Sequence, residues 1–194
     1  MHLTLYLWIL GVGPVIVFVC NVFFGSSGYP VWVLALLTWG NSIAIFGMDA
    51  LIATVIHKLP AEWFDPHKKI FCPYSWERRF YKFIRIIDWK DYIPDTGKLT
   101  TGLSKSKISS IKSDYLYHFL VETCYAETLH CWMAVSGIVN MIVNPHSLMI
   151  PLILPLALIN FGLNIPPVLI QRNNRPKLFH LYEMQVKKQQ NGVK

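Results

Sequence analysis

Long runs of apolar residues alternate with short polar breaks along most of this chain. One run extends from Leu3 to Phe24, and a second extends from Val31 to Ile56 after a break rich in Gly and Ser. A helix of about 20 apolar residues crosses the roughly 30 Å hydrocarbon core of a bilayer. The pattern therefore predicts two membrane-spanning helices, residues 3–24 and 31–56, joined as a hairpin.

A second apolar region lies towards the carboxyl end, where no Asp, Glu, Lys or Arg occurs between Thr128 and Gln171. Asn144-Pro145 breaks this region, so it predicts a second hairpin with helices at residues 115–143 and 148–170. Asp114 is the predicted N-cap of the first of these helices. Prolines inside the second helix free backbone carbonyls and predict a kink. Residues 171–194 follow as a basic tail.

Residues 58–113 form a basic segment that is too long to be a simple turn between spans. Within it, Ser75 to Asp88 predicts an amphipathic helix lying in the membrane interface. Pro94 to Gly97 predicts a turn, and Gly97 to Ser110 is small and polar enough to form a mobile flap. In the amphipathic helix the apolar side is predicted to carry Trp76, Phe80, Phe83, Ile84 and Ile87, and the basic side Arg78, Lys82 and Arg85.

Composition supports a membrane protein, because 53% of the 194 residues are hydrophobic and only 15% are charged. All 18 Lys and Arg lie in residues 58–112 and 172–194, and the net charge is +7. Basic segments beside apolar spans favour the cytoplasmic side over nucleic-acid binding, so no nucleic-acid partner is expected. The predicted fold is an all-α integral membrane protein with four transmembrane helices, a cytoplasmic interfacial helix and both termini cytoplasmic. Four cysteines suggest no disulfide framework.

Ionisable residues at the mouth of the third predicted span are the strongest candidates for chemistry. Glu122, Glu127 and His130 occur where the apolar run begins, and charged groups at such a position indicate function. On a helix, Glu127 and His130 lie about 60° apart, and Glu122 lies about 80° to the other side of His130. We therefore predict that His130 is a general base oriented by Glu127 and Glu122. Asp49, near the end of the second span, lies within reach of them.

The order of these motifs resembles a known family. Glu122-Thr123-x-x-Ala126-Glu127-x-x-His130 is similar to the Glu-Thr-x-Arg-Ala-Glu-x-x-His signature of the bacterial glycosyl-4,4'-diaponeurosporenoate acyltransferases. Asn164-Ile165-Pro166, then residues 171–178, resemble the closing Asn-x-Pro and Gln-Arg-Tyr-Asn-Arg-Pro-Arg-Leu of that family. Trp89-Lys90 resembles an upstream Trp-Lys element. The likeness extends over residues 63–178, with Tyr125 in place of the signature's Arg and Asn173 in place of its Tyr.

The resemblance implies an acyltransferase that esterifies a sugar hydroxyl of a glycosylated carotenoid or related glycolipid in the bacterial cell membrane. The acyl donor would be a co-substrate such as acyl-CoA or an acyl carrier protein, and no metal or other cofactor is expected. Arg side chains match the phosphates of such a donor. The residues expected to contact substrate are Arg172, Arg175, Asn164, Gln171, Asn173, Asn174, Asp49, Trp89 and Lys90.

Three other interpretations of the same residues remain open. His118, Glu122, Glu127 and His130 offer the ligand types of a metal-dependent enzyme that oxidises lipids, although only half of a di-iron motif is present. A non-enzymatic scaffold for a glycolipid pathway would need the spans but no catalytic group. Cys124 and Cys131 share a helical face and suggest a thioester relay, which the family pattern does not require.

Overall fold

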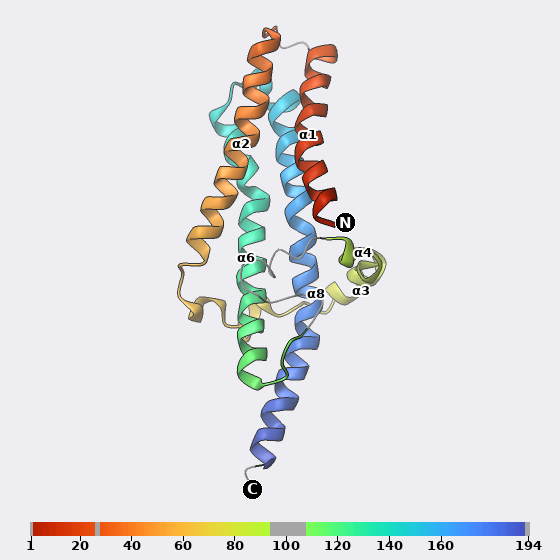
Figure 1. Ribbon diagram of the computed structural model, residues 1–194, viewed down its shortest axis with the longest axis vertical. Coiled ribbons are helices and arrows are strands. Elements are labelled where there is room, and N and C mark those ends of the chain that lie inside the picture. Colours follow the sequence, from red (N-terminus) through yellow and green to blue (C-terminus); the bar gives the residue numbers. More distant parts are fainter. Residues whose placement is uncertain (1, 26–27, 94–107, 193–194) are drawn as a thin grey trace. The chain divides into compact units, whose positions relative to one another are not determined.

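The computed structural model describes residues 2–25, 28–93 and 108–192, and these residues form helices and turns with no β-strand among them (Figure 1). The predicted all-α class is therefore confirmed for the described part of the chain. The helices are α1 (His2–Phe24), α2 (Val31–Ile56), α3 (Glu77–Phe83), α4 (Ile86–Trp89), α6 (Ser113–Val143), α7 (His146–Leu148) and α8 (Leu154–Gly192). Shorter elements are the 3-10 turns η1 (Ala61–Phe64), η2 (Lys69–Phe71) and η3 (Lys90–Tyr92) and the π-helical turn η4 (Met149–Ile153).

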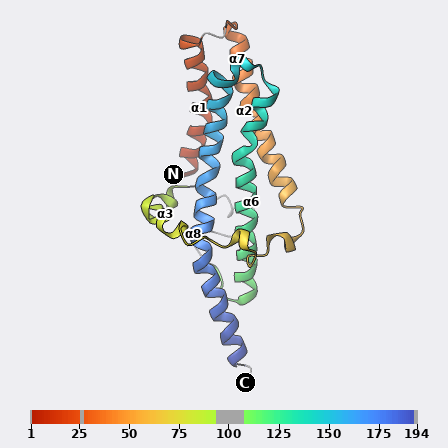
Figure 2. The same cartoon turned by 180° about the vertical axis from the view of Figure 1, so that it is seen from behind.

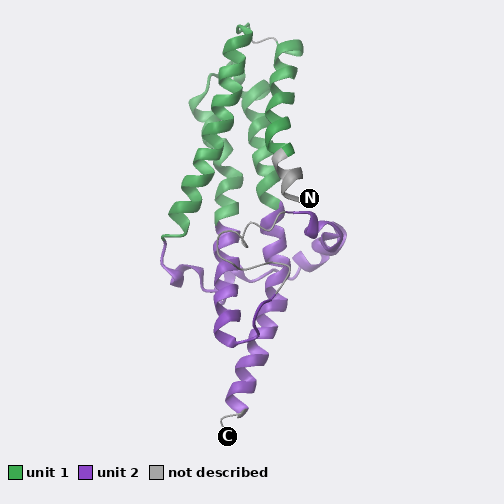
Figure 3. Cartoon of the chain, viewed as in Figure 1, with its two compact units in different colours: residues 1–58, 129–165 green, residues 59–128, 166–194 purple. Residues whose placement is uncertain are grey.

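The chain divides into two compact units, which Figure 3 shows in different colours. Unit 1 comprises Met1–Lys58 and Leu129–Ile165, and unit 2 comprises Leu59–Thr128 and Pro166–Lys194. Both α6 and α8 therefore contribute to each unit. Every Lys and Arg except Lys58 belongs to unit 2, and Asp49 is the only acidic residue in the sequence of unit 1. Unit 1 is thus almost free of charge, whereas unit 2 holds the basic residues.

Unit 1 is a bundle of apolar helices. The views from the front and from behind both show α1 and α2 running side by side (Figures 1 and 2). Both helices contact η4, and the aliphatic core includes Leu34, Ile45 and Leu152. The outer surface is also apolar, because Ile43 and Ile142 expose 70% and 79% of their area. A bundle with an apolar exterior is suited to hydrocarbon rather than to water.

A contact between small residues brings α6 and α8 close together in unit 1. A Cβ atom added at Gly137 would lie only 2.7 Å from the Cβ of Ala157. Small residues allow helix backbones to approach closely in a membrane, where dispersion forces rather than the hydrophobic effect hold helices together. A buried amide also joins α6 to α2, since Asn140 donates to the carbonyl of Asn41 at 3.2 Å.

Three helices of the described chain are long and apolar enough to cross a membrane. They are Val31–Ile56, Ser113–Val143 and the segment His146–Asn191, which includes α7, η4 and most of α8. The predicted spans at residues 31–56, 115–143 and 148–170 lie within these helices. The described apolar part of α1, Trp8–Phe24, is shorter than the other three. The structure therefore supports a multi-helix membrane protein, and a fourth crossing by α1 stays a prediction.

Unit 2 packs the segment that follows α2 against the first half of α6 and the second half of α8. Leu116 and Leu120 of α6 are fully buried and meet Leu178 of α8. Tyr81 of α3 and Ile86 of α4 form another buried cluster, here with Ile170. The first cluster joins α6 to α8, and the second fastens the predicted interfacial segment to α8.

The predicted amphipathic helix at residues 75–88 is interrupted. The structure has α3 and α4 in its place, separated at Arg85, whose φ of 52° is left-handed and cannot continue an α-helix. The apolar side is nevertheless exposed as the pattern suggested, with Phe83 and Ile87 exposing 84% and 66% of their area. The opposite side is buried through Glu77 and Tyr81, which the periodicity did not single out.

The carboxyl-terminal boundaries also differ from those predicted. The last helix does not end near Ile170 but continues to Gly192, because residues 171–192 pack and hydrogen-bond within unit 2. Helix α6 begins at Ser113, so Asp114 lies in its first turn rather than at the predicted N-cap position. A carboxylate in the first turn interacts favourably with the helix dipole. The predicted turn at residues 94–97 and most of the flap at residues 97–110 lie outside the described residues.

Candidate active site

His130 lies on α6 and meets Asn164 of α8 inside unit 1. Nδ1 of the imidazole and Oδ1 of Asn164 are 2.8 Å apart. The imidazole is half-buried. Among the described residues, no group is hydrogen-bonded to its second nitrogen, Nε2. One edge of the imidazole is therefore fixed, and the other keeps its hydrogen-bonding capacity.

The side-chain amide of Asn164 connects His130 to further polar groups. Its Nδ2 atom donates to the backbone carbonyl of Asn160 at 3.1 Å and to the Oδ1 atom of Asn160 at 3.0 Å. The same nitrogen lies 3.5 Å from Oδ2 of Asp49 on α2. Asn164, which we expected to contact substrate, thus has partners for both ends of its amide.

Asp49 is held by a second set of donors. The hydroxyl of Ser136 donates to Oδ1 of Asp49 at 2.7 Å, and Asn160 donates to that hydroxyl at 3.1 Å. Asn160 also donates to the carbonyl of Met133 at 2.7 Å. Asp49, Ser136, Asn160, Asn164 and His130 therefore form one connected polar array, which we call the His130 array.

The His130 array lies in the part of the chain that is poorest in charge. Polar groups buried in an apolar bundle are costly unless they are hydrogen-bonded, and a carboxylate is the most costly of them. Ser136, Asn160 and Asn164 are 4%, 3% and 6% exposed. Sequence reasoning missed Ser136 and Asn160, although the pair of Asn residues four apart in an otherwise apolar run was a signal.

A different polar cluster occupies unit 2 and is centred on Arg172. The guanidinium donates to Glu77 through Nε and Nη2, at 2.9 and 2.7 Å, and to Glu127 through Nη1 at 2.5 Å. Its remaining donors reach the carbonyls of Ile70 and Cys72 at 2.9 and 3.2 Å. An arginine has five N–H donors, and all five are used within unit 2.

Arg175 is buried more deeply than Arg172, with only 2% of its area exposed. It donates to the hydroxyl and the carbonyl of Thr123 at 2.9 Å and to the carbonyl of Phe71 at 2.7 Å. Its Nη1 atom also pairs with Glu127 at 2.6 Å. Glu127, expected beside the imidazole, thus has two arginine partners, while the partner of His130 is an amide.

Glu77 is the residue of this cluster that the sequence did not reveal. Burial alone would raise the pKa of its carboxyl, but hydrogen bonds from Arg172, Tyr81 and the backbone N–H of Tyr74 lower that pKa to about 2. Burial and the contact with this carboxylate raise the pKa of the Tyr81 hydroxyl well above its usual value. We call Glu77, Glu127, Arg172 and Arg175 the ion-pair cluster.

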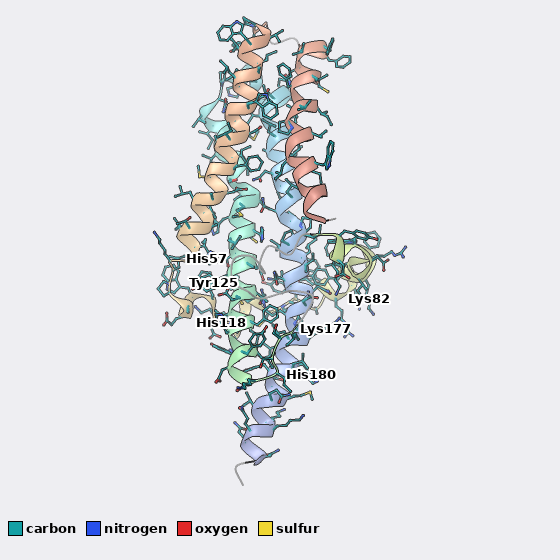
Figure 4. The ribbon with its side chains drawn as sticks, in the orientation of Figure 1. His57, Lys82, His118, Tyr125, Lys177 and His180 are labelled. Carbon is teal, nitrogen blue, oxygen red and sulfur yellow. The ribbon has the colours of Figure 1, made fainter. Side chains whose placement is uncertain are left out.

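Tyr125 explains one departure from the family signature. Its ring stacks on Phe64 of η1 with a centroid separation of 3.8 Å, and its hydroxyl donates to the carbonyl of Leu59 at 2.8 Å. Figure 4 labels Tyr125 on α6 beside the segment that follows α2. The tyrosine therefore fastens that segment to α6, which an arginine would do by different contacts.

The other residues predicted for the site belong neither to the His130 array nor to the ion-pair cluster. Glu122 is half-buried on α6, and Gln171, Asn173 and Asn174 are half-buried on α8. The indole of Trp89 donates to the carbonyl of Ile84 at 2.9 Å and packs in the core of unit 2. Cys124 is fully buried and Cys131 is exposed. Lys90, Gln171, Asn173 and Asn174 keep their predicted contact with substrate as a proposal only.

Described residues of unit 2 line pockets that are large enough to admit part of a ligand. One of about 270 Å³ lies between residues 66–73 and 175–183, and another of about 410 Å³ lies between the start of α6 and the end of α8. In unit 1 a hollow beside Asn160 has only about 20 Å³. Ligand pockets usually have about 300–1,000 Å³. The first pocket is lined mainly by Pro66, Phe71, Pro73, Arg175, Phe179 and His180, and the second by Asp114, Tyr117, His118, Val121 and Tyr182.

Among the described residues, no three His, Cys, Asp or Glu side chains are grouped closely enough to hold a metal ion. The metal-dependent interpretation of residues 118–130 therefore gains no support from the geometry. The long apolar helices, with a polar array inside their bundle, define the class of the protein as α-helical membrane proteins.

Comparison with known proteins defines the class further. Residues 60–184 match the profile of the glycosyl-4,4'-diaponeurosporenoate acyltransferase family. A protein of that name from Staphylococcus haemolyticus (strain JCSC1435) is 28% identical over 141 residues, which cover 71% of this chain and 80% of the relative. A protein of the same name from Staphylococcus aureus (strain N315) is 27% identical over 135 residues, covering 67% and 78%. No solved structure gives a significant match.

The chain belongs to the glycosyl-4,4'-diaponeurosporenoate acyltransferase family, because the family profile matches well over half of its length. It is therefore an acyltransferase, as the resemblance of residues 122–130 and 164–178 predicted. The membership does not favour the scaffold or the lipid-oxidising alternative.

Proposed function

We propose that this enzyme transfers a fatty acyl chain from an activated donor to a sugar hydroxyl of a glycosylated carotenoid or a related glycolipid. The relatives carry the name of that activity, and the family match over residues 60–184 includes the ion-pair cluster and all of the His130 array except Asp49. The observation that carries the proposal is the His130 array, which holds an imidazole by one nitrogen in an apolar bundle.

Acyl transfer to a hydroxyl needs a base, and we assign that role to His130. Nε2 would take the proton of the sugar hydroxyl while its oxygen attacks the acyl carbonyl carbon. The new ester C–O bond forms, the bond from the carbonyl carbon to the donor's leaving group breaks, and the proton passes from the imidazolium to that leaving group. With a thioester donor such as acyl-CoA or an acyl carrier protein, the group released is a thiol.

The arginines acquire a different role from the one expected from the sequence. All five donors of Arg172 are occupied, and Arg175 is almost completely buried, so neither side chain offers a free fork to a donor phosphate. We propose that the ion-pair cluster, including Glu127, holds the segment between α2 and α6 against α8. Exposed cations such as Arg78, Arg79 and Lys177 are better placed to meet an anionic donor (Figure 4 labels Lys177).

The distribution of charge supports a membrane arrangement for this chemistry. Lys and Arg are enriched on the cytoplasmic side of membrane proteins, and both basic blocks belong to unit 2 except for Lys58. We propose four crossings, with α1 as the first, and both termini in the cytoplasm of a bacterium. A lipid-linked acceptor would then enter from the bilayer, and a soluble donor would approach from the cytoplasm.

Lipid mass spectrometry tests the activity directly. A bacterial host that makes the glycosylated carotenoid acceptor would be given this chain or its His130→Ala variant. We expect a product heavier by one acyl group with the native chain and at least about 10²-fold less with the variant, the usual contribution of a general base.

His146→Ala is the matched control, because His146 is an exposed histidine of the same unit and lines neither pocket of unit 2. It should leave the product unchanged. A native chain that produces no acylated lipid would contradict the proposed acceptor, and normal product from His130→Ala at equal protein in the membrane would contradict the proposed base.

A further inference from the structure

The His130 array decides which nitrogen of the imidazole carries the proton. The Nδ2 atom of Asn164 faces the backbone carbonyl of Asn160 at 3.1 Å. A carbonyl oxygen only accepts hydrogen bonds, so the atom facing it must be the amide nitrogen rather than the amide oxygen. The carboxylate of Asp49, 3.5 Å from the same atom, imposes the same orientation. The amide of Asn164 therefore has one allowed direction.

The direction of the amide fixes its partner. Because Nδ2 of Asn164 faces the acceptors, Oδ1 faces His130, and this oxygen can only accept. Nδ1 of His130 must then be the donor and carry a hydrogen. In a neutral imidazole the other nitrogen, Nε2, then holds the lone pair that a base requires.

Asp49 gives the array its charge. It is the only carboxylic acid in the sequence of unit 1, and Ser136 donates to one of its oxygens at 2.7 Å. The other oxygen accepts from the Asn164 amide, so the negative charge is linked to the imidazole through one intervening side chain. Asp49 is half-buried, and a negative charge in this position favours the imidazolium that forms when Nε2 takes a proton.

We propose that Asn164 is a positioning residue that locks His130 as the Nδ1–H tautomer, and that Asp49 holds Asn164 in the required orientation. This inference rests on the proposed function, since it explains how the base of that reaction is prepared. Asn164 is suited to the task because it must donate to Asn160 and Asp49 while accepting from His130. An aspartate would lack the donors, and an apolar residue would lack both.

A purely structural role for the array is the competing explanation, because buried amides also join helices in membranes. Asn140 provides the matched control for such a role. It is buried in the same unit and donates to the carbonyl of Asn41 at 3.2 Å, outside the His130 array. Asn140→Leu and Asn164→Leu remove one buried amide each, but only the second removes the acceptor of the His130 ring.

The first experiment observes the tautomer and needs no substrate. Protein with labelled histidine rings is placed in lipid nanodiscs, and the His130 signal is identified by its loss in His130→Gln. Ring-nitrogen NMR should show a protonated Nδ1 and an unprotonated Nε2 in the native chain and in Asn140→Leu. In Asn164→Leu we expect the Nδ1–H form to lose its dominance. A native His130 protonated mainly on Nε2 would overturn the inference.

The second experiment measures acyl transfer in the same preparations. Asn164→Leu should lower kcat by at least about 10²-fold, because Nε2 of His130 then carries the proton and lacks the lone pair of a base, while KM changes little. Asp49→Asn should lower kcat less, and Asn140→Leu should leave it near the native value. An equal loss in both Leu variants would overturn the positioning role. A native chain with the Nδ1–H tautomer but no acyl transfer would contradict the proposed function and leave the tautomer assignment intact.

Discussion

Replacing Glu77 by Gln tests whether the ion-pair cluster holds unit 2 together. Glu77 receives two hydrogen bonds from Arg172, at 2.9 and 2.7 Å, and others from Tyr81 and the backbone of Tyr74. Its side chain is 4% exposed, so solvent screens these contacts weakly. The substitution keeps the shape of the side chain but removes its charge, and it leaves Glu127 as the one carboxylate paired with Arg172 among the described residues.

The pKa of Glu77 sets the magnitude of the effect. The contacts lower the pKa from an ordinary 4.5 to about 2. That difference corresponds to about 3 kcal/mol of folding free energy, comparable with the usual cost of breaking a buried ion pair. Because the folded-state pKa is the lower one, the contribution is fully present above about pH 4.5 and is lost as the pH falls towards 2. About half of it should remain near pH 3.

Hydrogen–deuterium exchange of the protein in detergent measures this effect locally. At neutral pH, peptides from residues 69–83 should exchange about 10²-fold faster in Glu77→Gln than in the native chain, after correction for intrinsic rates. Near pH 3 the ratio should fall to about tenfold. Glu62→Gln is the control, because Glu62 is an exposed acid of the same segment. Equal exchange in the two variants, or an undiminished ratio at low pH, would refute the structural role of the cluster.

Three further predictions concern packing and the membrane. Gly137→Ala should lower the stability of the helix bundle by about 1–3 kcal/mol in denaturant titrations, because its Cβ would lie 2.7 Å from a neighbouring Cβ, whereas Gly40→Ala has open space and should not. Brominated lipids should quench the fluorescence of Trp76, which is identified as the signal that disappears in Trp76→Phe. The quenching should be weaker in Phe83→Ser, because Trp76 and Phe83 are both exposed on the apolar side that is expected to enter the membrane interface. Tyr125→Phe should cost about 1 kcal/mol and leave acyl transfer active, since only its hydrogen bond to the segment after α2 is lost.

Much of the fold could be predicted from local patterns. Helix α2 has the predicted bounds, Val31–Ile56, because an apolar run that ends at polar residues is a local feature. The family could also be predicted from the sequence, because the order and spacing of Glu122, Glu127, His130 and Asn164 do not depend on which residues they contact. The amphipathic segment was located correctly, but its break at Arg85 depends on a backbone conformation that periodicity does not report.

The partners of the site residues could not be predicted in this way. Helical spacing suggested that Glu127 orients His130, yet Glu127 pairs with Arg172 and Arg175 from a segment 45 or more residues away. His130 meets Asn164, 34 residues away along the chain. Spacing on one helix reports only which side chains share a face, and it contains nothing about the helix that packs against that face.

Hydropathy and motif order therefore determined that this chain is an apolar, helical acyltransferase with its Lys and Arg confined to two basic blocks. Only the tertiary structure decided that Asp49 belongs with Ser136 and Asn164, and that Glu77 holds Arg172 across 95 residues of sequence. The physical reason is that burial in an apolar interior obliges each polar group to find a partner, whereas the choice of partner depends on which helices pack together.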